Sequence, residues 1–394
     1  MPTLIDEVIT VKFFLLAFFF TLLGLWLLIR FRVLDSWFDP TILTVFQLLI
    51  TFVGLSYLSI LPLNQIIGFV IFLSILFFFK VNIKPIKVVS PEFWMQFSYF
   101  LLVVIVILNT ILLSKKGFIY LVEDASDARL VYYQGYGLFQ RINHLAAPIF
   151  AINAFYLLRA NRKFLFYIYL IVSSYLLLAL GSKSSMLTFI FLYGAYYKFH
   201  HETEIEILKR NKATLIVLVT LMFLTSFGMF FLIYRNDFAN AFLFRMISFS
   251  DGPFYFYFDH LQRYISYPPM YMFDQLFVAL RIYPNLKFMG LGANINYYYY
   301  NYYDLLNGPN PQIFVESQVL FGRYFFWIMY VVAAFLFVFL RKLCSGPITF
   351  YFISFFVATL TIDSQYAFSL IFDYLLLCVL LLVYRCFKLV WEYI

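Results

Sequence analysis

Residues 93–113 read FWMQFSYFLLVVIVILNTILL, a run with no charged side chain that is long enough to cross a membrane as a helix. Similar apolar runs recur along the whole chain, separated by short segments that hold most of the charged residues. We predict eleven spans from them, near residues 10–29, 41–61, 63–79, 93–113, 144–159, 164–180, 186–199, 213–234, 318–340, 348–362 and 366–385. The expected fold is an all-α polytopic integral membrane protein.

The composition excludes an ordinary soluble domain. Of the 394 residues, 64% are hydrophobic and only 12% are charged, against roughly a quarter charged in soluble proteins. The net charge of +8 does not indicate a nucleic-acid partner, because the basic residues are scattered and form no continuous stripe. Asp6 and Glu7 precede the first run where a signal peptide would be basic, so we expect a retained span. The three cysteines are too few for a disulfide framework.

Basic residues cluster at every second boundary between the predicted spans, as they do in cytoplasmic loops of membrane proteins. The clusters are Arg30/Arg32, Lys80/Lys84/Lys87, Arg159/Arg162/Lys163, Lys198/Lys209/Arg210/Lys212, Arg341/Lys342 and Arg385/Lys388. They hold sixteen Lys and Arg, against six in the N-terminus and the short loops of the opposite face. We therefore expect the N-terminus outside the cytoplasm and the C-terminus inside it.

One long segment, residues 235–317, cannot be embedded in lipid. We expect three parts: residues 1–234 with eight spans, residues 235–317 as a large external loop, and residues 318–394 with three spans. Inside the loop, the apolar spacing predicts short amphipathic helices at Phe254–Tyr264, where Asp259 and Arg263 would pair one turn apart, and at Phe273–Ile282. Turns are expected at Gly290–Gly292 and Asn307–Pro311, on either side of a run of tyrosines.

The loop is rich in arginine, tyrosine and asparagine. Arginine binds phosphate through a planar fork of donors, so several arginines beside a bilayer suggest a phosphorylated lipid headgroup. Tyrosine rings and amides can stack on sugars and hydrogen-bond to them. Both features also have simpler interpretations, because tyrosines often anchor a protein at the membrane surface and single arginines near headgroups are often only solvated.

The sequence has neither the spacing of a metal site nor the glycine-rich loop of nucleotide enzymes, since its four histidines are dispersed. We therefore expect no metal and no cofactor. A substrate must then bring its own energy. A polyprenyl-pyrophosphate sugar does so, because pyrophosphate is a good leaving group whose charge arginines can stabilise.

Three short motifs resemble the O-antigen and capsule repeat-unit polymerases (Wzy-type), which are membrane glycosyltransferases. They are Gly181-Ser182-Lys183-Ser184-Ser185 after the sixth span, Tyr234-Arg235 at the start of the loop, and Pro309-Asn310-Pro311 followed by Glu316 and Phe321-Gly322. The resemblance covers most of the chain in architecture and about twenty residues in motif. Lys183 stands where the family often has arginine, which keeps the charge but loses the fork.

The resemblance implies a GT-C-like polymerase of O-antigen or another surface polysaccharide. Such an enzyme joins undecaprenyl-pyrophosphate-linked oligosaccharide repeat units at the periplasmic face of a bacterial inner membrane. The implied partners are these lipid-linked oligosaccharides, membrane lipids and a chain-length regulator protein. Two alternatives stay open. A lipid-linked oligosaccharide flippase would be expected to place cationic residues inside its spans, and an O-antigen ligase looks to carry a His-Asn pair where this chain has Pro309 and Asn310.

Residue roles follow from the loop composition and the resemblance together. The catalytic candidates, one of which would take the proton of the acceptor hydroxyl, are Glu316 and His260. The candidates for holding pyrophosphate are Arg235, Arg245, Arg263, Arg281, Lys183 and Arg141. The candidates for holding sugar are Tyr299, Tyr302, Tyr303 and Asn310. Glu316 could instead cap a helix or pair with Arg323, and His260 could be a surface residue.

The predicted topology can be tested in the middle of the loop. Asn301→Cys should be labelled by a membrane-impermeant thiol reagent in intact spheroplasts, because the loop is expected to face the periplasm. Labelling that occurs only after lysis would show that the predicted topology is inverted.

Overall fold

The computed structural model describes residues 11–80, 82–86, 90–117, 132–133, 135–179, 188–210, 220, 251–282, 290–300 and 310–393. Regular structure in these ranges is helical, apart from one isolated bridge between Ile86 and Cys344. Almost all of the span predicted at 213–234 lies outside the described residues. So do five candidate site residues: Lys183, Arg235, Arg245, Tyr302 and Tyr303. Of Tyr299 only the backbone is described.

Nine of the predicted spans each coincide with one helix in the described residues, so the helices expected there are confirmed. They are α2 (Val11–Arg30), α3 (Ile42–Tyr57), α4 (Leu63–Phe78), α5 (Pro91–Lys116), α7 (Gly137–Arg159), α8 (Lys163–Ala179), α9 (Thr188–Arg210), α17 (Pro347–Leu360) and α18 (Ser364–Tyr393). Among the described helices, two stretches are long and apolar enough to cross a membrane: Pro91–Lys116 and Ser364–Val390. This property rests on length and composition, so the eleven spans and their direction remain predictions.

The signals that start and stop α5 show why its sequence forms a helix there. Ser90 precedes the helix, and its hydroxyl accepts a hydrogen bond from the Phe93 N–H at 3.2 Å. Pro91 occupies the first position, where its missing N–H costs nothing. Gly117 ends the helix with φ +69, a conformation that glycine adopts without strain.

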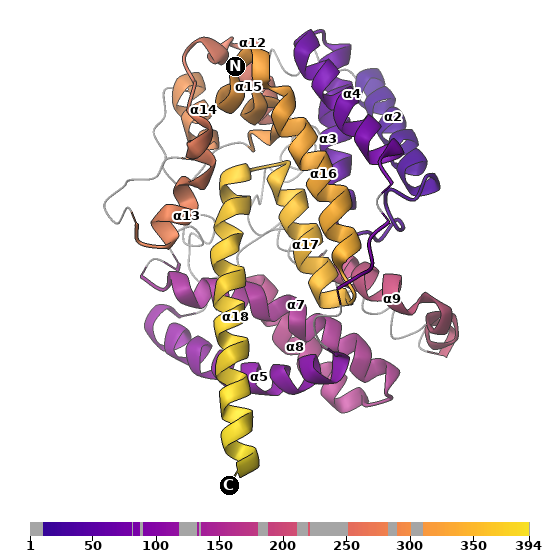
Figure 1. The fold of residues 1–394 in the computed structure, drawn as a ribbon, viewed down its shortest axis with the longest axis vertical. Helices are drawn as coiled ribbons and strands as arrows, with labels where there is room; N and C mark the ends of the chain where they lie inside the picture. The colour runs from indigo at the N-terminus through magenta and orange to yellow at the C-terminus, as the bar shows by residue number, and fades with distance from the viewer. Residues whose placement is uncertain are drawn as a thin grey trace. The chain divides into compact units, whose positions relative to one another are not determined.

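The chain divides into two compact units, which Figure 1 shows in ribbon form. Unit 1 comprises the described parts of Met1–Lys84, Ala239–Leu343 and Ile353–Phe372. Within it, α4 packs along α16 (Trp327–Leu343). Gly68 permits this approach, because a Cβ atom there would lie 2.4 Å from the fully buried ring of Tyr330.

Unit 2 comprises the described parts of Pro85–Phe238, Cys344–Phe352 and Asp373–Ile394. Its central helix is α7, which is buried along most of its length and packs against α5, α8 and α9. Small side chains on α7 let the neighbouring helices approach closely, as they do in many membrane helix bundles. The fully buried examples are Ala146, Ala147, Ala151 and Ala154.

The single span predicted at 318–340 is wrong in form, because the structure has two helices there. α15 (Gln312–Phe325) is broken at Gly322, where φ is +67 and ψ is −171, and α16 follows it. Hydropathy could not locate this break, since one glycine leaves an apolar run apolar. The backbone angle at one residue decides it.

The loop helices also differ from the prediction. The first, α12 (Asp251–Phe258), ends early because His260 is left-handed, with φ +54, and the short helix η5 (Leu261–Arg263) follows. Asp259 and Arg263 are therefore not one helical turn apart.

The remaining loop helices depart in the same way. The helix expected at Phe273–Ile282 is shorter in the structure, where α13 (Asp274–Ala279) directly follows the 3-10 helix η6 (Pro269–Phe273). The turn expected at Gly290–Gly292 is wrong, because α14 (Leu291–Tyr300) begins within it. This helix carries the first tyrosines of the run.

Gly252 offers a test of how α12 docks on the start of α15. A Cβ atom at Gly252 would lie 2.1 Å from the backbone oxygen of Asn310, and backbone cannot move aside as a flexible side chain can. We expect Gly252→Ala to lower the free energy of unfolding by about 1–3 kcal/mol. Thermal unfolding of the purified protein in detergent, followed by intrinsic fluorescence, measures the change.

Gly137→Ala is the matched control, because nothing lies within 4 Å of a Cβ atom at that position. Equal unfolding temperatures for the two variants would show that α12 is not held this tightly.

Candidate functional site

The first turn of α15 is joined to the turn between α17 and α18 by backbone hydrogen bonds. The Gln312 N–H donates to the Ile362 carbonyl at 2.9 Å, and the Ile313 N–H donates to the Thr361 carbonyl at 2.8 Å. Gln312 is left-handed, with φ +55, so the chain bends as α15 begins. This junction, which lies wholly in unit 1, positions Glu316.

Glu316 is buried at this junction, with 1% of its surface exposed. Its Oε1 accepts a hydrogen bond from the Ser364 N–H, the first residue of α18, at 2.8 Å. Its Oε2 is buried and has no hydrogen-bond partner in the described residues. Glu316 therefore caps the N-terminus of α18, which was one of its structural alternatives, while Arg323 is exposed.

Burial raises the pKa of Glu316 well above its usual range, and the neighbouring Asp363 carboxyl raises it further. The hydrogen bonding from Ser364 opposes these effects and stabilises the charged form. Glu316 consequently holds its proton to a higher pH than an exposed glutamate does. A buried carboxyl with a raised pKa suits general acid or base chemistry.

A second polar group surrounds the next residues of α15, inside the spans predicted for α4 and α16. Gln65 Oε1 accepts hydrogen bonds from the hydroxyls of Ser317 at 2.9 Å and Tyr330 at 2.7 Å. The Asn64 amide donates to Gln318 Oε1 at 3.1 Å. Buried polar side chains of this kind must be paired, because an unpaired one costs about 1–3 kcal/mol. Sequence reasoning missed this group because the partners come from distant segments.

The other described loop candidates of unit 1 lie at its surface. His260, Arg263, Arg281 and Asn310 are exposed, whereas Glu316 is buried. Their exposure leaves them accessible to an external ligand. The structure does not draw them into one buried constellation with Glu316.

Arg141 belongs to unit 2, where it has an internal partner. Its guanidinium forms an ion pair with Asp373, whose side chain is 4% exposed, and His144 Nδ1 lies 3.5 Å from the other oxygen of that carboxylate. Pyrophosphate binding by Arg141 stays a prediction. Asp373 was visible in the sequence as a lone acid in an apolar run, but its partners were not.

The polar contacts of unit 2 extend beyond this ion pair. Asn109 of α5 and Asn143 of α7 exchange amide hydrogen bonds at 3.0 and 3.1 Å, and Asn143 also donates to the Tyr133 hydroxyl at 3.3 Å. Polar residues inside apolar helices usually mark a functional path or a helix contact.

A scan against protein-family models, a search of curated proteins and a search of solved structures found no match to this chain. The fold and site therefore rest on the contacts described above.

The raised pKa of Glu316 makes stability depend on pH in a defined direction. The unfolded chain ionises this carboxyl near 4.5, whereas the folded chain keeps its proton to a higher pH. The stability contributed by this group is complete below the unfolded pKa and is lost as pH rises through the folded pKa. Glu316→Gln keeps an oxygen acceptor and cannot ionise. We expect this variant and the wild type to have the same unfolding temperature at acid pH. As pH rises, the variant should unfold at a higher temperature than the wild type.

Thermal unfolding of both proteins across a pH series measures this difference, in which titrating groups that do not interact with residue 316 cancel. Glu316→Ala is the control, because it removes the acceptor of the Ser364 N–H. It should lower the free energy of unfolding by about 1–3 kcal/mol, and so unfold at a lower temperature, at every pH. A constant gap between Glu316→Gln and the wild type across the series would show that the carboxyl has an ordinary pKa.

Proposed function

We propose that this chain is a multispan membrane glycosyltransferase of the repeat-unit polymerase kind. It would join undecaprenyl-pyrophosphate-linked oligosaccharides at the periplasmic face of a bacterial inner membrane. The observation that carries the proposal is the Glu316 carboxyl, which is buried, keeps one oxygen without a partner in the described residues and has a raised pKa. It lies where the polar loop meets the apolar helices.

In this proposal the acceptor hydroxyl attacks the anomeric carbon of the donor sugar. A new glycosidic bond forms as the bond from that carbon to the pyrophosphate oxygen breaks. The proton of the hydroxyl passes to the base, and the pyrophosphate leaves with its negative charge held by arginines. Arg263 and Arg281 are exposed and accessible for that role. The reaction consumes no nucleotide, because the donor carries its own leaving group.

The choice of base depends on access. Glu316 can receive a proton from an acceptor only if α15 separates from the turn before α18, because both its oxygens are buried there. His260 needs no such movement, since it is exposed and sits in a left-handed turn between α12 and η5. We therefore keep both Glu316 and His260 as candidates for the general base.

One observation favours the alternative of a lipid-linked oligosaccharide flippase. The sequence places almost no cationic residue inside a span, yet the structure brings Arg141 and His144 to Asp373, which lies within the span predicted at 366–385. Ionisable groups at such depth commonly mark a transport path.

The polymerase is tested by extension of purified lipid-linked repeat units in EDTA and without nucleotide. If arginines bind the leaving group bidentately, lysine loses a hydrogen bond to a charged group, which costs about 1.5–3 kcal/mol, or about 10- to 100-fold in rate. We expect this loss in one or more of Arg235→Lys, Arg245→Lys, Arg263→Lys and Arg281→Lys. Glu316→Gln should lower turnover and leave donor binding intact.

Arg323→Lys is the control, because Arg323 is exposed in the same unit and has no assigned role. If all four lysine variants and Glu316→Gln make wild-type polymer, the loop is not the active site. Failure of the wild type to extend any donor, together with translocation of a fluorescent lipid-linked oligosaccharide that Asp373→Asn abolishes, would establish the flippase instead.

A further inference from the structure

Four tyrosines of unit 1, here named the tyrosine row, form two stacked pairs, Tyr264 with Tyr298 and Tyr267 with Tyr271. The rings of Tyr264 and Tyr298 are nearly parallel, with centroids 6.1 Å apart and 14° between their planes. The rings of Tyr267 and Tyr271 are 4.2 Å apart at 11°. The pKa of Tyr267 is raised first by burial and then by Tyr298, so the two pairs are near enough to interact electrostatically.

The row runs from an exposed end to a half-buried end. Tyr264 is 66% exposed and Tyr298 is 45% exposed, whereas Tyr267 and Tyr271 are half-buried. Carbon atoms in contact lie about 3.5–4.0 Å apart, so parallel rings with centroids at 6.1 Å must be displaced sideways. Tyr264 and Tyr298 therefore form an offset stack, and both are exposed at this end of the row.

The inner end of the row is held in place by hydrogen bonds. The Asn294 amide donates to the Tyr271 hydroxyl at 3.2 Å, and the Gln365 amide donates to the Tyr271 carbonyl at 3.0 Å. The Tyr267 N–H donates to the Val319 carbonyl of α15 at 3.1 Å, one helical turn beyond Glu316. A surface fixed in this way loses little entropy when a ligand binds.

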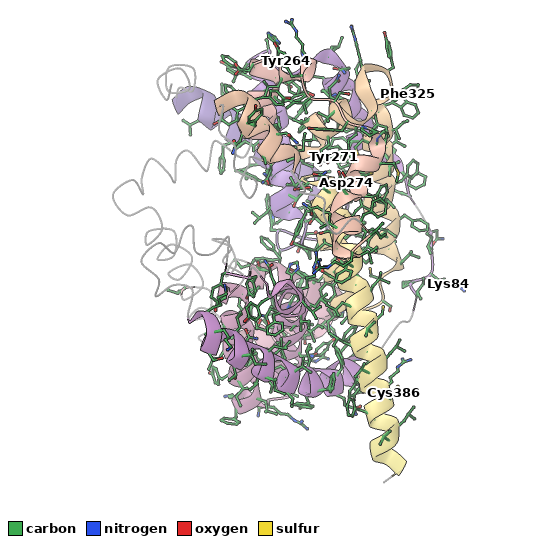
Figure 2. All side chains as sticks on the ribbon, turned by 90° about the vertical axis from the view of Figure 1, so that its left-hand side faces the viewer. Lys84, Tyr264, Tyr271, Asp274, Phe325 and Cys386 are labelled. Atoms are coloured by element: carbon green, nitrogen blue, oxygen red, sulfur yellow. The ribbon has the colours of Figure 1, made fainter. Side chains whose placement is uncertain are left out.

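Polar groups accompany the half-buried end of the row. Here the amide of Asn294 and the carboxyl of Asp274 accompany Tyr271 at the half-buried end. Figure 2 shows Asp274 close to Tyr271, with Tyr264 farther along the same unit.

A ligand that fits must be flat and apolar on its faces and hydroxylated at its edges, which describes a sugar ring. The geometry points to the tyrosine row as a binding surface for neutral sugars of a glycan chain. The negative charge of Asp274 disfavours phosphate and uronic acid at the inner end. The inference rests on the proposed function for the origin of the glycan, and its four tyrosines differ from those that the sequence suggested.

The test measures binding of the purified full chain to arrays of neutral oligosaccharides and of oligosaccharides that contain uronic acids. We expect the wild type to bind neutral members in preference to acidic ones. Aromatic contacts of this size correspond to about two- to tenfold in affinity, so Tyr264→Ala and Tyr298→Ala should each weaken binding by about that factor. Tyr264→Phe keeps the ring and should retain most of the affinity.

Tyr324→Ala is the matched control, because Tyr324 is 80% exposed in the same unit and outside the row. The inference is overturned if no glycan binds, if acidic glycans bind better, or if Tyr324→Ala weakens binding as much as Tyr264→Ala. The extension assay separates the two proposals. Normal polymerisation by Tyr264→Ala and Tyr298→Ala would contradict the role of the row and support the polymerase. Glycan binding without any extension would contradict the polymerase and support the row.

Discussion

The pairing of two helix ends holds unit 1 together. A helix leaves its first N–H groups and its last carbonyls without partners, and in apolar surroundings each unpaired group costs several kcal/mol. The start of α15 donates two N–H groups to the Thr361 and Ile362 carbonyls just beyond the end of α17, so these N–H groups are paired. Glu316 completes the junction by accepting the first N–H of α18. Glu316, the candidate general base, therefore also has a structural role.

These two roles make different demands on residue 316. Capping α18 requires only an oxygen acceptor, which a glutamine would supply without an ionisable group. The carboxyl adds a cost, since burial and Asp363 both oppose its ionisation. What it supplies in return is a proton that is held to a higher pH than on an exposed glutamate. That property supports the proposed chemistry and has no use in a cap.

Sequence patterns predicted where helices form. They failed where a single residue determines a break in a helix or where a side chain pairs with a distant partner. Apolar runs located the helices because hydropathy is summed over many residues. They could not locate the break at Gly322 or the left-handed turn at His260, each of which depends on one backbone angle. Nor could they pair Arg341, expected at a cytoplasmic boundary, with Asp39, since the structure buries that cation against a carboxylate 302 residues away.

The same limit applies to the candidate site, because its parts meet around a single turn of α15. Successive helical side chains point about 100° apart, so Glu316 reaches α18 while Ser317 and Gln318 reach α4. The Val319 carbonyl accepts the Tyr267 N–H of the tyrosine row. The sequence shows these four residues only as neighbours. A movement that exposed Glu316 to a substrate would have to carry or break the other three contacts. Gly322 lies just beyond this turn, so the break there frees α15 from following the axis of α16.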